Sequence, residues 1–155
     1  MSPSATEPIL LCYDRSAGAR RAIETAGALF PGRKAIVLHV WSPMTVAVAA
    51  YGGIAPVPPY DESALERAAL AVAEEGAAVA KDAGLEATPE AAEGTYEGTW
   101  HAILDAAEKH RAAIVVLGAR GLSTFKSLLL GSVSHGVAQH AQAPVLIVPP
   151  ATRGE

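Results

Sequence analysis

Several residue types that define common protein classes are scarce in this sequence. Its 155 residues include one cysteine, Cys12, so no internal disulfide can form. Only 8 residues are aromatic, and no apolar stretch reaches the roughly eighteen residues of a membrane-spanning helix. Pro3, Glu7, Pro8 and Asp14 interrupt the stretch in which a secretion signal would need an unbroken apolar core. We therefore expect a cytoplasmic protein with no membrane partner.

Positive charge is also scarce. Twelve Lys and Arg against sixteen Asp and Glu give a net charge of −4, which argues against a general binder of nucleic acid. The charge is uneven, however, because residues 61–97 hold ten acids and two bases, whereas residues 98–155 hold three acids, five bases and four of the five histidines. This distribution leaves room for a local anion site in the last third of the chain.

Small aliphatic residues are abundant instead. The chain has 33 alanines, and Leu, Ile and Val fill 34 further positions. Alanine favours helices, so an all-β fold is disfavoured, and a chain of this length can bury a core without a disulfide or a metal. We expect a single domain over 1–155, with its core in 7–149 and short flexible termini.

Four compact apolar runs have the length of β-strands and do not alternate with polar residues. They are Ile9 to Tyr13, Ala35 to Trp41, Ala112 to Leu117 and Val145 to Val148. Runs that are apolar at every position are typical of parallel strands covered on both faces. A weaker fifth strand is predicted over Leu85 to Ala92, at a sheet edge because it contains Pro89.

Helical patterns lie between these strands. They follow Ser16, Asp61, Thr99 and Ser132, each a residue type that favours a helix start. The alternation predicts an α/β fold with an open five-stranded parallel sheet, strand order 3-2-1-4-5 and helices on both faces. In that order a crevice opens at the carboxyl ends of strands 1 and 4, so the residues after Tyr13 and Leu117 should line the functional site.

The segment 42–60 fits neither pattern. It combines prolines and glycines with apolar side chains such as Val46, Tyr51 and Ile54. Two interpretations remain open: an irregular loop that makes a mobile surface excursion, or a functional segment that serves as a flap over the crevice or as a partner contact.

A group of glycines follows the fourth strand. Gly118, Gly121 and Gly131 are joined by a stretch that contains Arg120, Ser123, Thr124 and Lys126, and Gly131-Ser132 opens a helix. Glycines let backbone N–H groups approach a phosphate, and a helix N-terminus attracts one. The alternative is that the glycines only make a tight turn and that Ser132 is an ordinary helix cap. The spacing matches neither a Walker A loop nor the dinucleotide fingerprint.

This glycine spacing resembles the ATP-binding signature of the universal stress protein family. Gly118, Gly121, Gly131 and Ser132 occupy its fixed positions, with two residues between the first two glycines and nine before the last. The resemblance extends over nearly the whole chain, and its other segments are residues 9–16, 37–40 and 143–148. It implies the adenine nucleotide alpha hydrolase-like fold, ATP with Mg²⁺ as the ligand, and a homodimer formed through the edge strand Val145–Val148.

The resemblance also implies roles for individual residues. Asp14 would contact the ribose, although its charge could equally favour the N-terminus of the following helix. The Val40 backbone would meet the adenine, and Cys12 would lie beside it. Around the phosphates the resemblance places Leu117, Gly118, Arg120, Gly121, Gly131, Ser132 and Val133.

Catalytic chemistry has little support in the sequence. No Gly-x-Ser-x-Gly elbow is present, the histidines have no metal-ligand spacing, and no residue stands out as the base that ATP hydrolysis would need. We expect His39 to be a hydrogen-bonded strand residue and His135 to face solvent. The sequence favours a nucleotide-dependent stress-response or signalling module, at most a weak ATPase, over a nucleotide-independent dimeric scaffold. A response-regulator phosphoacceptor is disfavoured because no aspartate ends the third strand.

Overall fold

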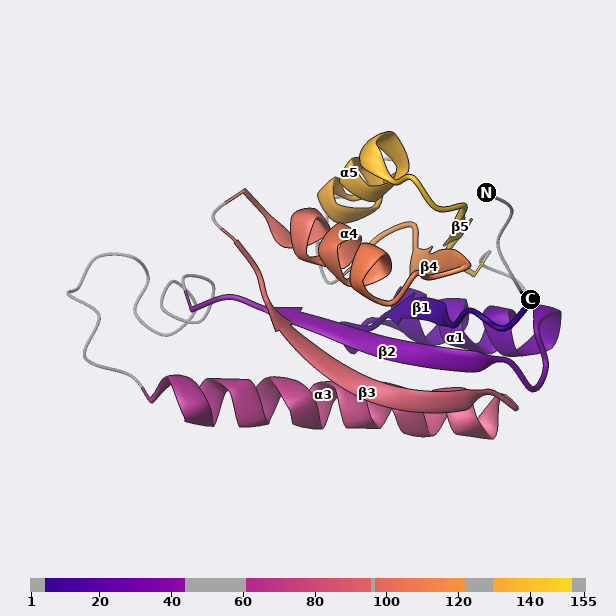
Figure 1. The fold of residues 1–155 in the computed structure, drawn as a ribbon, viewed down its shortest axis with the longest axis horizontal. Coiled ribbons are helices and arrows are strands. Elements are labelled where there is room, and N and C mark those ends of the chain that lie inside the picture. The colour runs from indigo at the N-terminus through magenta and orange to yellow at the C-terminus, as the bar shows by residue number, and fades with distance from the viewer. Residues whose placement is uncertain (1–4, 44–60, 96, 122–129, 152–155) are drawn as a thin grey trace.

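The fold is an open parallel sheet between two layers of helices (Figure 1). The structure, a computed structural model, describes residues 5–43, 61–95, 97–121 and 130–151. The strands are β1 (Ile9–Cys12), β2 (Lys34–Trp41), β3 (Glu86–Glu93), β4 (Ile114–Gly118) and β5 (Val145–Val148). The helices are α1 (Ala17–Leu29), α3 (Glu62–Asp82), α4 (Thr99–Lys109) and α5 (Ser132–His140).

The strand order β3-β2-β1-β4-β5 confirms the predicted topology. All four neighbouring pairs are parallel. At the centre of the sheet, Leu11 of β1 lies opposite Val37 of β2 and Val116 of β4. β1 and β4 are adjacent, but the chain leaves them toward opposite sides of the sheet, so their carboxyl ends bound the predicted crevice.

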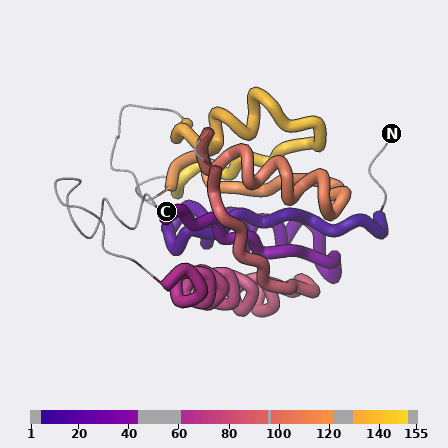
Figure 2. Tube along the Cα trace, turned by 60° about the vertical axis from the view of Figure 1, so that its left-hand side comes forward, coloured from indigo at the N-terminus to yellow at the C-terminus, as the bar shows by residue number. Residues whose placement is uncertain are grey.

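Each face of the sheet has its own apolar core. Ile9 and Leu11 point to the face covered by α1 and α3, whereas Leu10 points to the face covered by α4 and α5. Figures 1 and 2 show α3 on one side of the sheet and α4 with α5 on the other. Burial on both faces explains why β1 is apolar at every position.

Small residues bring the helices close to the sheet. A Cβ placed on Gly76 of α3 would lie 2.7 Å from the Tyr13 ring and from Val37, and one on Gly118 of β4 would lie 2.8 Å from the carbonyl carbon of Gly18 in α1. The buried faces of these helices are mostly alanine. The alanine-rich composition therefore serves close contact between helices and sheet.

Three predicted features can be compared with the observed elements. β3 lies at a sheet edge as predicted, and Pro89 pairs with Val37 in its register. Ser16 caps α1, because its Oγ accepts a hydrogen bond from the Ala19 amide at 3.1 Å. The predicted cap at Ser132 is wrong: the N-cap of α5 is Gly131, and Ser132 is the first helical residue.

Two predictions concern parts of the chain that the structure does not describe. Of the predicted irregular loop 42–60, only residues 42 and 43 are described, so both interpretations of this loop stay predictions. The flexibility predicted for the termini likewise concerns residues 1–4 and 152–155, outside the described range. Within the described ranges, no helix is long and apolar enough to cross a bilayer.

Candidate functional site

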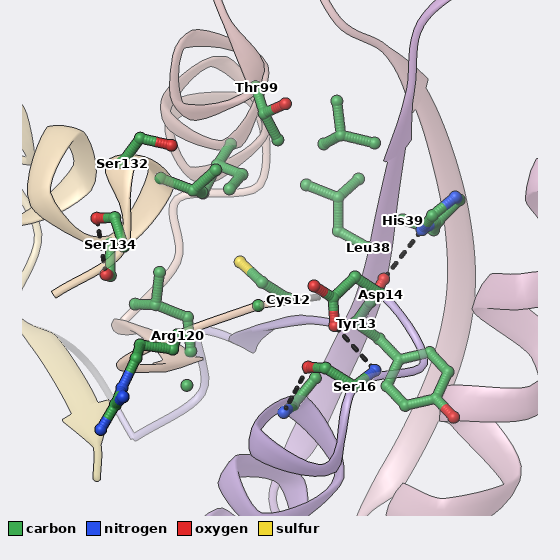
Figure 3. Close-up of a pocket in the computed structure, with 18 residues that line it drawn as sticks. Cys12, Tyr13, Asp14, Ser16, Leu38, His39, Thr99, Arg120, Ser132 and Ser134 are labelled. Atoms are coloured by element: carbon green, nitrogen blue, oxygen red, sulfur yellow. Dashed lines mark hydrogen bonds between the residues drawn. The ribbon is translucent and has the colours of Figure 1, made fainter. Parts of the chain in front are cut away.

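A cavity of about 220 Å³ opens at the carboxyl ends of β1 and β4 (Figure 3). Its wall includes all ten residues predicted for the site: Cys12, Asp14, Val40, Leu117, Gly118, Arg120, Gly121, Gly131, Ser132 and Val133. They come from β1, β2, β4, α5 and the turns after β1 and β4. The topology therefore brings together in space residues that are more than 100 positions apart in the sequence.

The wall also contains residues that the sequence interpretation did not assign to the site. They are Tyr13, Ser16, Ala19, Leu38, His39, Thr99, Ile103 and Ser134. Thr99 and Ile103 belong to α4, which follows β3 and so begins at the carboxyl edge of the sheet. Thr99 could have been predicted as a site residue from this position in the topology, although no sequence motif marks it.

One part of the cavity wall is apolar. Leu38 and Leu117 are almost fully buried, and Ile103 reaches in from α4. Cys12 is half-buried, and its side chain borders the cavity. Burial, with a smaller contribution from the charge of Asp14, raises the pKa of its thiol to about 12. Cys12 is therefore a neutral, weakly polar side chain in a wall suited to a planar apolar group.

Asp14 brings a carboxylate to the edge of this apolar wall. Its Oδ1 accepts a hydrogen bond from the Ser16 amide at 2.9 Å, which closes a local turn. Its Oδ2 lies on the side of Gly121, where a Cβ would come within 2.6 Å of it. Both predicted roles are compatible with this geometry, since Asp14 lies at the start of α1 and also faces the cavity.

The three glycines of the motif are explained by space and not by backbone conformation. Gly118, Gly121 and Gly131 all lie outside the region of positive φ. Gly118 is needed because the α1 backbone passes close to β4, and Gly121 leaves space for Asp14 Oδ2. Gly131 has only ordinary contacts, the nearest being the Ala119 carbonyl oxygen at 3.6 Å from an added Cβ. Its lack of a side chain keeps the start of α5 open.

The N-terminus of α5 forms one end of the cavity. No side chain within the described ranges caps this helix. The buried Ser134 hydroxyl lies 2.7 Å from the Ala119 carbonyl oxygen, to which it donates, and the Gly131 amide donates to the same oxygen at 2.8 Å. These bonds hold the start of α5 against the end of β4. The first backbone N–H groups of α5 have no hydrogen-bond partner inside the helix.

The family of this protein can be assigned by comparing its sequence with family models. A sequence model described as "Universal stress protein family" matches residues 5–149, which is more than nine-tenths of the chain.

The chain belongs to the universal stress protein family.

Individual relatives agree with this assignment. The universal stress protein YxiE of Bacillus subtilis (strain 168) is 32% identical over 146 residues, which cover 90% of this chain and 97% of YxiE. A solved universal stress protein in complex with cAMP has the same fold, with a TM-score of 0.69, 24% identity, and coverage of 94% of this chain and 98% of the other. The Archaeoglobus fulgidus universal stress protein in complex with dAMP has a TM-score of 0.62, 18% identity, and coverage of 94% and 99%.

Arg120 lines the cavity of this universal stress protein, but its guanidinium does not approach Asp14. Figure 3 shows its guanidinium pointing away from Cys12 and Asp14. Its buried Nε has no hydrogen-bond partner among the described residues. A buried donor without an acceptor is unfavourable, so this Nε is an unsatisfied polar group in the present conformation of Arg120. Ser123, Thr124 and Lys126, predicted to supply further donors, lie outside the described residues.

The histidines of this universal stress protein follow the sequence expectation. Within β2, His39 donates from Nδ1 to the Tyr13 carbonyl oxygen at 2.9 Å, and His135 of α5 is exposed and does not line the cavity. Across the described ranges, His, Cys, Asp and Glu side chains form no group of three or more that could hold a metal ion.

Proposed function

We propose that this universal stress protein binds ATP in the cavity between the ends of β1 and β4, as a nucleotide-dependent stress-response or signalling module of the cytoplasm. The observation that carries the proposal is that three kinds of chemistry share one cavity wall. An apolar section, a carboxylate and an open helix N-terminus all line this cavity. These are the groups that a base, a sugar and a phosphate chain, respectively, would contact.

Each section of the wall fits one part of the nucleotide. Cys12 and Val40 would lie beside the adenine, and Asp14 Oδ2 would accept hydrogen bonds from ribose hydroxyls. Gly121, Gly131 and Ser132 would surround the phosphates, and Arg120, which also lines the cavity, would add positive charge near them. Bound Mg²⁺ would neutralise part of the phosphate charge. The cAMP and dAMP complexes of family members support an adenine nucleotide as the ligand class.

The phosphate end of this proposal can be tested at Gly131. Replacing Gly131 with valine should weaken ATP binding by about tenfold or more, because the side chain would occupy the open helix start. An alanine Cβ at this position meets nothing closer than 3.6 Å in the protein, so the site tolerates a side chain without a clash. The measurement is calorimetric titration of nucleotide-free protein with ATP and Mg²⁺.

A matched control is Ala138→Val, which adds carbon to an exposed position of the same helix. It should bind ATP as the wild-type protein does. Equal affinity of Gly131→Val and Ala138→Val would show that phosphates do not bind at the α5 N-terminus. Gly121→Val is a less specific probe, because a Cβ there would also displace Asp14.

We further propose that the protein is a homodimer through β5. Val145, Leu146 and Ile147 are half-buried in the single chain, and β5 pairs with β4 on one side only among the described strands. A short apolar edge strand gains most by pairing with a second copy of itself.

A further inference from the structure

Arg15, directly after Asp14, has an unusual backbone conformation. Its φ is 67°, in the left-handed region that glycine and asparagine adopt most readily. A residue with a long side chain stays in this region only when its surroundings hold it there. Because Arg15 connects Asp14 to the N-terminus of α1, whatever holds Arg15 also sets the direction of the Asp14 side chain.

The side chain of Arg15 is held by the middle of α3. Its Nε donates to Glu75 Oε2 at 2.8 Å, and its Nη2 donates to Glu75 Oε1. The guanidinium therefore forms a bidentate pair with the carboxylate. The hydrogen bond from Arg15 holds the pKa of Glu75 below its ordinary value, and the same bond raises the pKa of Arg15. Both side chains are about half exposed, so we expect little effect of the pair on overall stability.

The same place on α3 also holds the residue before Asp14. Gly76, next to Glu75, lies so close to the Tyr13 ring that a Cβ would come within 2.7 Å of it. The Tyr13 backbone is tied to β2, because its amide donates to the Leu38 carbonyl oxygen and its own carbonyl accepts from His39. Asp14 itself accepts from the Ser16 amide. Its orientation therefore depends on neighbours that are fastened to α3 and β2.

We propose that Arg15 and Glu75 are a positioning pair: they hold Asp14 in the direction needed to accept from the nucleotide sugar, and thereby couple occupancy of the cavity to α3. This inference rests on the proposed binding of ATP. The pair does not touch the ligand and acts through Asp14. Coupling is reciprocal, so a nucleotide that requires this direction of Asp14 strengthens the contact between Arg15 and Glu75 by the same factor.

The binding test uses Glu75→Gln, which keeps the shape of the side chain and removes its charge. Glu74→Gln is the matched control, because Glu74 is the exposed neighbour on the same helix. Glu75→Gln should weaken ATP binding about threefold to tenfold while Glu74→Gln leaves it unchanged. In an Asp14→Asn background, Glu75→Gln should cause no further loss. Equal affinities of the two glutamine variants, or an undiminished loss in the Asp14→Asn background, would overturn the proposal.

A second measurement does not need the nucleotide. Hydrogen exchange of the nucleotide-free protein reports the bond between the Ser16 amide and Asp14. The Ser16 amide should exchange faster in Glu75→Gln than in wild type or Glu74→Gln, whereas amides in β1 keep their rates. Unchanged exchange at Ser16 would overturn the positioning role. Faster exchange in a protein that binds no ATP would support positioning of Asp14 and refute the proposed function instead.

Discussion

At the scale of single residues, Cys12 and Asp14 show how adjacent parts of one cavity differ in chemistry. Cys12 ends β1 within an apolar wall, and Asp14 stands two residues later in a turn closed by the Ser16 amide. The charge of Asp14 adds to the effect of burial on the thiol. A neutral thiol beside a fixed carboxylate suits a ligand with an apolar ring and a hydroxylated neighbour.

The raised pKa of Cys12 predicts low thiol reactivity. At pH 8 its reaction with a neutral alkylating reagent such as iodoacetamide should be about two to three orders of magnitude slower than that of free cysteine, because almost no thiolate is present. The rate should still rise with pH beyond pH 9, where free cysteine has levelled off. Mass spectrometry of the alkylated protein gives both rates. Rapid labelling at pH 8 with a plateau near pH 9 would contradict the high pKa.

Individual site residues could be predicted where a local motif marks them. The glycine spacing and the family resemblance built on it identified ten positions that the fold gathers into one cavity wall. The partners of those residues could not be predicted in the same way. Arg15 and Glu75 are 60 positions apart, and nothing in the local sequence pairs them. The need for a glycine at position 118 could not be predicted either, because it comes from the close approach of the Gly18 backbone in α1.

At the scale of elements, the contact between α1 and β4 governs the shape of the cavity entrance. Gly18 and Gly118 let the helix backbone lie directly against the end of the strand. Ser134 then fastens α5 to the same strand end through the Ala119 carbonyl. Two of the helices that border the cavity, α1 and α5, are thus held against the end of β4 by these contacts.

Gly118→Ala should destabilise the fold through this contact. The new Cβ would lie 2.8 Å from the carbonyl carbon and 2.9 Å from the oxygen of Gly18, and both are backbone atoms that can move only with the helix. Overpacking of this kind costs about 1–3 kcal/mol. Urea unfolding measures the loss. Gly131→Ala is the comparison, because its Cβ has no such contact; its cost should come from the lost glycine N-cap alone, about 0.5–1 kcal/mol. Equal unfolding midpoints would refute the packing role of Gly118.

The elements themselves were largely predictable because their signals are local. Uniformly apolar runs predicted β1, β2, β4 and β5, and Pro89 correctly placed β3 at an edge. The first residue of α5 was harder to predict from the sequence. Both glycine and serine are frequent helix caps, and the backbone conformation is needed to show that Gly131 takes this role. Local propensity therefore predicted which helices exist better than it predicted the residues at their ends.

At the scale of the whole molecule, the sheet separates two apolar cores and leaves β5 at one edge. β3, at the other edge, carries the exposed Glu86 and Glu93, whose charges disfavour pairing with another strand. Val145 to Val148 have no such protection. Of the two edges in the described sheet, that of β5 is the better suited to pair with a second copy.

The expected result in solution is a dimer. Sedimentation equilibrium at micromolar concentration should give a mass of twice 15.9 kDa. Because pairing would cover the apolar residues of β5, hydrogen exchange of the β5 amides should slow as the protein concentration rises. A mass of 15.9 kDa throughout the micromolar range would refute dimerisation through β5.

The central claim is that the cavity binds ATP, and amide chemical shifts measure this most directly. In a titration of ¹⁵N-labelled, nucleotide-free protein with ATP and Mg²⁺, the account predicts saturable shifts at residues 12–16, 117–121 and 131–133. Amides at the opposite end of the sheet, such as those of Leu85 and Ala113, should stay in place. Unchanged amide shifts at millimolar ATP, or saturable shifts gathered elsewhere, would contradict it.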